Sequence, residues 1–221
     1  NFKNKYVMQL VQSIPGFSDL YYQPKSGFQW EDIRNAAVVN CGDQKYFCSE
    51  DFLSGAYEGL SFELSDVTTQ HLVRSGKKTR VDEIFSGQVI CFHRFDDRKE
   101  SDGHLQIFQK EFLSNIKGWT AGQKVETDHA GFNSKFQIYA ADAHNAYYIL
   151  TPQVIEKIME FAAAVDEQIA ITFRGKYMFV AICRIRSMFN PVVDVPVHEQ
   201  TQYILGDMAL LQKAKEILIA D

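Results

Sequence analysis

A short basic segment is the first part of the sequence whose residue types could do chemistry. It contains four basic residues close together: Arg74, Lys77, Lys78 and Arg80. Gly76 lies among them, between two stretches that alternate polar and apolar residues, which predicts the exposed tip of a β-hairpin. Residues 76–79 (Gly-Lys-Lys-Thr) have only part of the phosphate-loop pattern G-x-x-x-x-G-K-[ST] and lack its strand-to-helix setting. The segment therefore predicts either a solvated tip or a contact for acidic lipid headgroups or an acidic partner.

Three acid–base residues are the candidates for catalysis. Asp128, His129 and His144 flank a predicted strand at residues 136–140 and are close enough in sequence to meet in space. An Asp can orient a His, which can then act as a general base. No nucleophile is marked by a motif such as G-x-S-x-G. A hydrolase or small-ligand enzyme using these three residues is therefore the alternative function, and ordinary surface or capping His residues are the simpler interpretation.

The histidine and acidic residues of the sequence show no spacing that is typical of a metal site. No two His residues have the i, i+4 spacing that places two imidazoles on one helix face. One charged segment contains Asp96, Asp97, Glu100 and Asp102. It does not match the calcium loop D-x-[DN]-x-[DN]-G-x5-E, so we interpret it as a solvated loop. His93 lies in an apolar strand, where a hydrogen-bonded core His is expected, and we predict no metal and no cofactor.

Composition limits the function classes further. A net charge of −5 and a pI of about 5.7 do not favour nucleic-acid binding. Four cysteines are present, Cys41, Cys48, Cys91 and Cys183, without C-x-x-C spacing, and a chain of this length needs no disulfides to stabilise its core. No apolar run approaches the about 20 residues that span a bilayer, and no signal-peptide pattern is present. We expect a reducing, cytoplasmic environment.

The elements that must position these residues are clearest between Phe136 and Val180. Residues 136–140 alternate as a strand, and residues 146–150 are predicted as a second short strand. Thr151-Pro152 is a typical helix start, and the apolar residues after it recur at helical spacing up to Val165. Two alternating strands then flank Arg174-Gly175-Lys176, which predicts a tight hairpin in the centre of the sheet.

The rest of the sequence predicts helices near both ends and strands between them. Helices are expected at residues 6–14, 30–39 and 203–219. Strands are expected at residues 60–64, 69–73, 89–95 and 105–107, with a turn at Ser65-Asp66 and an irregular stretch at 125–133. This order predicts an α+β fold, mainly an antiparallel sheet that is curved or half-barrel, with a helix inserted after a central strand. We expect a single domain, residues 1–221, with an N-terminal helical lead-in at 1–40.

Several segments resemble the bacterial domain-of-unknown-function 3137 family. They are Ala146–Pro152 with the helix after it, Gly175–Ile182, Asp51–Val67 and Phe85–Asp96. The resemblance covers most of the chain, and its motifs are turns, caps and core positions. It implies no activity and no site residue. Because members of that family often have predicted transmembrane helices before this domain, it implies the soluble cytoplasmic part of a membrane protein.

The absence of a catalytic pattern and the basic segment together predict a function. We expect a non-enzymatic, cytoplasmic interaction module at the inner face of a membrane, which binds a protein partner or an anionic membrane surface.

Overall fold

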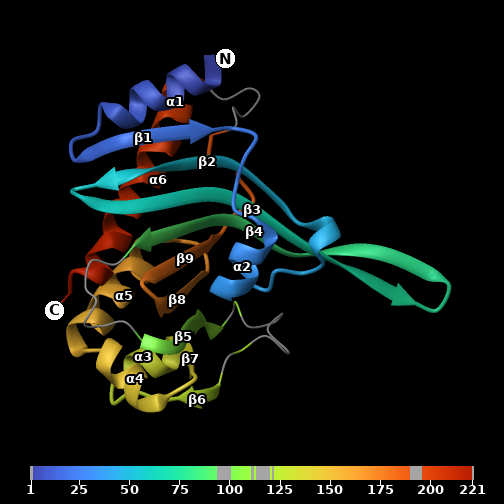
Figure 1. The fold of residues 1–221 in the computed structure, drawn as a ribbon, viewed down its shortest axis with the longest axis vertical. Helices are drawn as coiled ribbons and strands as arrows, with labels where there is room; N and C mark the ends of the chain where they lie inside the picture. The colour runs from blue at the N-terminus through green and yellow to red at the C-terminus, as the bar shows by residue number, and fades with distance from the viewer. Residues whose placement is uncertain are drawn as a thin grey trace.

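The chain folds around one antiparallel sheet with an apolar layer on each face (Figure 1). The computed structural model describes residues 2–93, 101–110, 112, 120, 122–189 and 196–220. In this part of the chain the strands are β1 (Phe17–Gln23), β2 (Cys48–Tyr57), β3 (Leu60–Ser75), β4 (Lys78–His93), β5 (Ser101–Gln109), β6 (Gln123–Val125), β7 (Phe136–Ala140), β8 (Ile169–Gly175) and β9 (Tyr177–Cys183). Their order in the sheet is β1-β2-β3-β4-β9-β8-β5-β7-β6. The sheet is not closed, and the fold class is α+β, as predicted.

Helices cover the sheet unevenly. They are α1 (Phe2–Gln12), α2 (Trp30–Ala36), α3 (Ala130–Lys135), α4 (Ala143–Ile149), α5 (Pro152–Ala164) and α6 (Val197–Leu218), with a 3₁₀ turn η1 (Gln44–Tyr46). Side chains of α1, α3, α4, α5 and α6 pack into the larger apolar layer, which we call the first layer. α2 packs into a smaller one, the second layer, on the other face. No helix in the described residues has the length and hydropathy of a membrane span.

The helix α5 and the β8–β9 hairpin confirm the prediction for this stretch. Thr151 caps α5 by accepting a hydrogen bond from the Val154 amide at 3.3 Å, and Pro152 occupies the first turn. The apolar stripe of α5 is buried at Val154, Ile155, Ile158 and Phe161. Gly175 adopts a φ of 53° in the turn of the hairpin. Both strands contribute to both layers, which makes this hairpin central in the sheet.

The predicted turn at Ser65-Asp66 and the predicted strand at residues 146–150 are wrong. Ser65 and Asp66 pair with Val89 and Gln88, so β3 runs on without a turn. Residues 146–149 belong to α4, which Asp142 caps by accepting from the His144 amide at 3.0 Å. A short apolar run has no decisive periodicity, and here the cap and tertiary packing favour the helix.

Strands β3 and β4 extend beyond the body of the protein as a two-stranded ribbon (Figure 1). The two strands pair as far as Ser75 opposite Lys78, with a register irregularity after Thr69. Such irregularities increase the local twist and turn the strands away from the sheet plane. Gly76 has a φ of 60° at the first position of the two-residue turn, where glycine avoids strain. We call residues 70–83 the ribbon.

Candidate functional site

The predicted basic tip lies at the end of the ribbon. Arg74, Lys77, Lys78 and Arg80 are all exposed. The Arg80 Nε atom lies 2.9 Å from Oδ1 of Asp82, and 75% of the Arg80 side chain is exposed. No acidic residue lies between Arg74 and Arg80. The structure thus concentrates positive charge at the point of the molecule that is farthest along the ribbon (Figure 1).

The predicted catalytic candidates lie elsewhere, near α3 and α4. Asp128, His129 and His144 are all exposed. The Nδ1 atom of His129 accepts a hydrogen bond from the Phe132 amide at 2.9 Å and so caps α3. Within the described residues, no hydrogen bond or ion pair joins these three side chains, and none of them lines the cavity described next. Their predicted catalytic role stays a prediction. Asp96, Asp97 and Glu100 lie outside the described residues, and of Asp102 only the backbone is described, in β5.

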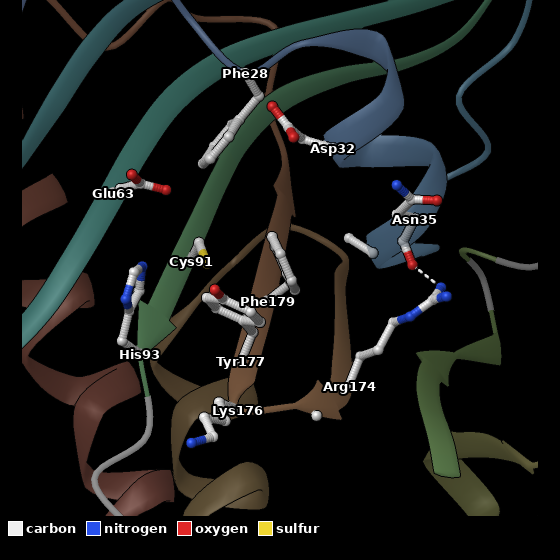
Figure 2. A pocket seen from close by; sticks show the side chains of 12 residues that line it. Phe28, Asp32, Asn35, Glu63, Cys91, His93, Arg174, Lys176, Tyr177 and Phe179 are labelled. Atoms are coloured by element: carbon white, nitrogen blue, oxygen red, sulfur yellow. Dashed lines mark hydrogen bonds between the residues drawn. The ribbon is translucent and has the colours of Figure 1, made fainter. Parts of the chain in front are cut away.

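A cavity of about 710 Å³ lies between α2 and the sheet face that carries the second layer. Its apolar wall contains Phe28, Tyr177 and Phe179, and its polar residues come from four elements (Figure 2). They are Asp32 and Asn35 from α2, Glu63 from β3, Cys91 and His93 from β4, and Arg174 and Lys176 from the β8–β9 turn. The cavity therefore combines both charge signs with an aromatic surface.

Three side chains with metal-ligand chemistry meet at one side of this cavity. Glu63 lies directly opposite Cys91 in the β3–β4 pairing, and His93 follows Cys91 on the same face of β4. The carboxylate, sulfur and imidazole nitrogen atoms of these residues all lie within 4.8 Å of one another. The His93 ring also contacts the Tyr177 ring edge-on, with centroids 4.9 Å apart. The sheet register, which brings two distant segments together, creates this cluster.

Burial differs sharply within the cluster. Only 2% of Cys91 is exposed, and burial raises the pKa of its thiol, with smaller contributions from the Glu63 and Asp32 carboxylates. Glu63 is half-buried, whereas His93 is exposed at the end of β4. The prediction that His93 is a core histidine is therefore wrong, because its side chain is exposed and lines the cavity instead of packing into an apolar layer. The Cys-x-His spacing on a strand was the one local signal for this cluster.

Two cationic side chains, Arg174 and Lys176, line the cavity from the β8–β9 turn. The Arg174 guanidinium donates a hydrogen bond from Nη1 to the backbone oxygen of Asn35, which ties the hairpin turn to α2 (Figure 2). Lys176 occupies the same turn, directly after Gly175, and also lines the cavity. On α2, Asp32 accepts a hydrogen bond from the Gln29 amide at 2.8 Å as part of a capping box. These bonds fix the walls of the cavity.

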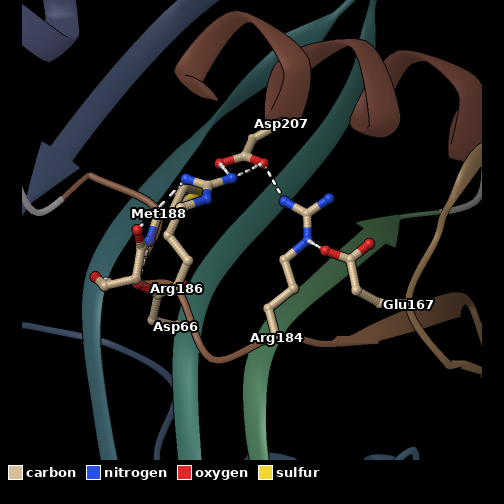
Figure 3. A network of polar contacts seen from close by, with 7 residues as sticks. Asp66, Glu167, Arg184, Arg186, Met188 and Asp207 are labelled. Carbon is tan, nitrogen blue, oxygen red and sulfur yellow. Dashed lines mark hydrogen bonds and ion pairs between the residues drawn. The ribbon is translucent and has the colours of Figure 1, made fainter. Parts of the chain in front are cut away.

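A second polar cluster lies under α6 on the opposite face (Figure 3). The Asp207 carboxylate, with 1% of its side chain exposed, pairs with both Arg184 and Arg186. Arg186 donates from Nη2 to both oxygens of Asp207, at 2.9 and 3.1 Å, and Arg184 also pairs with Glu167 at 2.9 Å. Every charge here has a partner, so the cluster fixes α6 to the segment after β9.

Asp66 lies beside this cluster and is a different case. Its Oδ2 atom accepts hydrogen bonds from the Ser187 hydroxyl and the Met188 amide, both at 2.7 Å. Its Oδ1 atom is buried without a hydrogen-bond partner in the described residues. Burial raises the pKa of Asp66 to about 6, while the bonds from Ser187 and Met188 lower it.

Comparison with known proteins identifies the family. The model of the family described as "Protein of unknown function (DUF3137)" matches residues 83–218, more than half of the chain. The chain belongs to the DUF3137 family. No curated protein matches this DUF3137 domain. Among solved structures, the crystal structure of the mycobacterial trehalose monomycolate transport factor A, TtfA, aligns over 98% of this chain and 94% of its own, with 10% identity and a TM-score of 0.48.

Proposed function

We propose that this DUF3137 domain is a non-enzymatic interaction module that binds anionic membrane surfaces through the tip of its ribbon. The observation that supports the proposal is the position of four exposed basic residues, Arg74, Lys77, Lys78 and Arg80, at the end of a ribbon that extends away from the folded body (Figure 1). A lipid surface is broad and flat, and a projecting tip reaches it without obstruction from the rest of the molecule.

The ribbon presents its charge on both faces. Residues that pair across the two strands share a face, and successive residues alternate between faces. Arg74 pairs with Thr79, whereas Arg80 pairs with Val73 on the opposite face, and Lys77 occupies the turn. A membrane surface therefore meets basic side chains from either side of the ribbon.

Apolar side chains stand next to the basic ones. Leu72 pairs with Val81, which is 41% exposed, and neither residue belongs to the two core layers. Exposed apolar residues beside lysine and arginine are the combination that interfacial membrane contacts use. This pair favours a lipid surface over a purely ionic contact with an acidic protein.

The expected strength follows from the number of basic residues. Each Lys or Arg near an anionic leaflet contributes about 1 kcal/mol, so four contribute about 4 kcal/mol, or roughly a thousandfold in affinity. The net charge of the whole chain is −5, so the attraction is local to the tip. We expect salt to weaken it over the Debye length.

A location at the inner face of the membrane agrees with this function. Anionic lipids are concentrated in the cytoplasmic leaflet. All four cysteines are free thiols, as a reducing compartment requires. The location is part of the same proposal and would be abandoned if the protein does not bind lipid.

Vesicle sedimentation tests the proposal. The double substitution Lys77→Ala with Lys78→Ala removes two charges from the tip, and we expect binding to phosphatidylserine-containing vesicles to weaken by about 2 kcal/mol, or about 30-fold. The matched control is Lys25→Ala with Lys135→Ala, which removes the same charge from two other exposed positions. The control should bind like the wild type.

Two results would overturn the membrane contact. One is equal binding to neutral phosphatidylcholine vesicles and to anionic ones. The other is an equal loss in the tip variant and the control, which would show that net charge alone decides binding. If the protein binds no vesicle but binds an acidic protein, the partner of the ribbon tip is that protein and not a lipid surface.

The hydrolase alternative on Asp128, His129 and His144 receives no specific support from the geometry. The Nδ1 atom of His129 is already engaged in capping α3, and the three exposed side chains line no part of the large cavity.

A further inference from the structure

The cluster of Glu63, Cys91 and His93 offers three different metal-ligand atoms to one point. Thiolate sulfur, imidazole nitrogen and carboxylate oxygen are the three donor types that zinc accepts in proteins. Calcium and magnesium prefer oxygen donors alone, so the sulfur and nitrogen atoms argue against both of them. The donor set thus selects a transition-metal ion, and a redox-inactive zinc ion fits it best.

The spacing of the donor atoms is close to what a tetrahedral site needs. Zinc bonds of about 2.0–2.3 Å place neighbouring donors roughly 3.3–3.8 Å apart. The three atoms here lie within 4.8 Å of one another, so small side-chain rotations are sufficient. The backbone needs no movement, because β3 and β4 hold Glu63 opposite Cys91 and place His93 on the same face.

The electrostatic surroundings favour a cation. Among the described residues, the Glu63 carboxylate has no ion-pair partner, and Asp32 of α2 is a second carboxylate near the Cys91 sulfur. Burying such a group without a counter-charge is unfavourable. A divalent ion would neutralise this charge, and Cys91 would release its thiol proton to solvent on binding.

We propose that Glu63, Cys91 and His93 bind a zinc ion through three protein ligands, with the fourth coordination position facing the cavity. Three protein ligands with an open fourth position form a coordination pattern that accepts water or an exogenous ligand. The cavity of about 710 Å³ has room for a small molecule at that position.

The cationic residues of the cavity lining indicate what that fourth ligand is. Arg174 and Lys176 line the same cavity from the β8–β9 turn, and both bind anions well. A water molecule or a small carboxylate- or phosphate-containing anion would therefore bridge the zinc ion and these cationic side chains. The aromatic surface of Phe28 and Phe179 would contact its apolar part.

Cobalt substitution gives the sharpest test of the metal site. The full chain is stripped with a chelator and titrated with Co²⁺, which reports its ligands by absorption. We expect a thiolate-to-cobalt charge-transfer band and intense visible bands typical of tetrahedral coordination, saturating at an equimolar ratio. Zinc should then displace the cobalt and abolish both signals.

Variants assign the ligands. Cys91→Ser should remove the charge-transfer band, and His93→Gln should weaken zinc binding at least about tenfold in competition with a chromophoric chelator. Because Cys91 is buried, its variant could fail to fold, whereas His93 is exposed and its variant keeps the test valid. The control is Cys48→Ser with His198→Gln, which changes the same residue types at exposed positions.

The outcomes separate cleanly. A charge-transfer band and a zinc affinity that His93→Gln lowers and the control does not would establish the site. No charge-transfer band, or equal affinity in wild type, His93→Gln and control, would overturn it. Circular dichroism of each variant confirms that the fold is retained. Vesicle binding is measured separately, because the end of the ribbon lies away from α2, whose residues line the cavity (Figure 1).

Discussion

At the scale of single residues, buried charge divides into compensated and uncompensated groups. Asp207 accepts from two arginines, so its burial is balanced by direct partners. Tyr22 donates its hydroxyl to the buried carboxylate of Asp51, and burial together with that bond raises the pKa of Tyr22. Among the described residues, Asp66 has two donors on one oxygen and none on the other, which leaves its ionised form poorly stabilised.

Asp66 should therefore make stability depend on pH. In the unfolded chain an Asp titrates near 3.8, whereas in the folded protein the pKa of Asp66 is raised to about 6. Between these values the folded state keeps a proton that the unfolded state has lost. The contribution of Asp66 to stability is thus greatest below about pH 4, declines up to about pH 6 and stays low above it.

The variant Asp66→Asn removes this titration and keeps an oxygen for Ser187 and Met188. Relative to wild type, we expect its free energy of unfolding to rise by up to about 3 kcal/mol between about pH 4 and pH 7.5. Urea denaturation at several pH values measures the difference. Asp128→Asn, at an exposed position, is the control. A constant difference between Asp66→Asn and wild type across this range would contradict the assignment.

At the scale of elements, local sequence patterns predicted individual helices and turns, but they did not predict which strand residues pair. α5 and the β8–β9 turn follow from a cap, an apolar stripe and a glycine, all contained within a few consecutive residues. The sequence did not predict that β3 continues through Ser65-Asp66, because two consecutive polar residues are typical of a turn. Their strand conformation comes from pairing with Val89 and Gln88 of β4.

The same limit explains the candidate site. The basic tip could be predicted, because its charge and glycine are adjacent in sequence. The cluster of Glu63, Cys91 and His93 could not, because it depends on which residue of β3 lies opposite Cys91. A shift of one residue would turn Glu63 to the other face of the sheet.

The ribbon is an element whose removal should leave the body intact. His71 and Asp82 are paired, so an Asn-Gly turn can replace residues 72–81 and close the hairpin at that point. None of the removed residues belongs to either apolar layer. We expect the free energy of unfolding to change by less than about 1 kcal/mol.

Thermal unfolding and vesicle sedimentation on this shortened protein measure the two properties separately. Loss of vesicle binding with unchanged stability would show that the ribbon is an interaction element. A shortened protein that unfolds at a much lower temperature would instead show that the ribbon supports the core.

At the scale of the whole molecule, the two apolar layers share their strands. Ile90 packs into the first layer, and its neighbours Val89 and Cys91 pack into the second. The same holds in β8, where Ile171 and Ala170 face opposite sides. If these strands unfold, both apolar layers lose packing residues at the same time, so the sheet couples the stability of its two faces.

The N-terminal residues are part of this arrangement. In the first layer, Val7 and Val11 of α1 are buried together with residues of α6, and the Tyr6 hydroxyl is hydrogen-bonded to Thr201 of α6. α2 supplies Ile33 to the second layer. These contacts favour one domain of residues 1–221 in which the helical lead-in at 1–40 is an integral part.

We therefore predict one cooperative unfolding transition for the whole chain. In a Trp119→Phe variant, Trp30 reports the second layer by fluorescence, because its indole donates to the Gly42 carbonyl at 3.2 Å beside α2. Far-ultraviolet circular dichroism reports mainly the helices of the first layer. Because both layers share β4, β8 and β9, the two signals should give coincident denaturation curves. Deletion of α1 should shift both curves together to lower denaturant concentration, whereas separate midpoints would divide the chain into two domains.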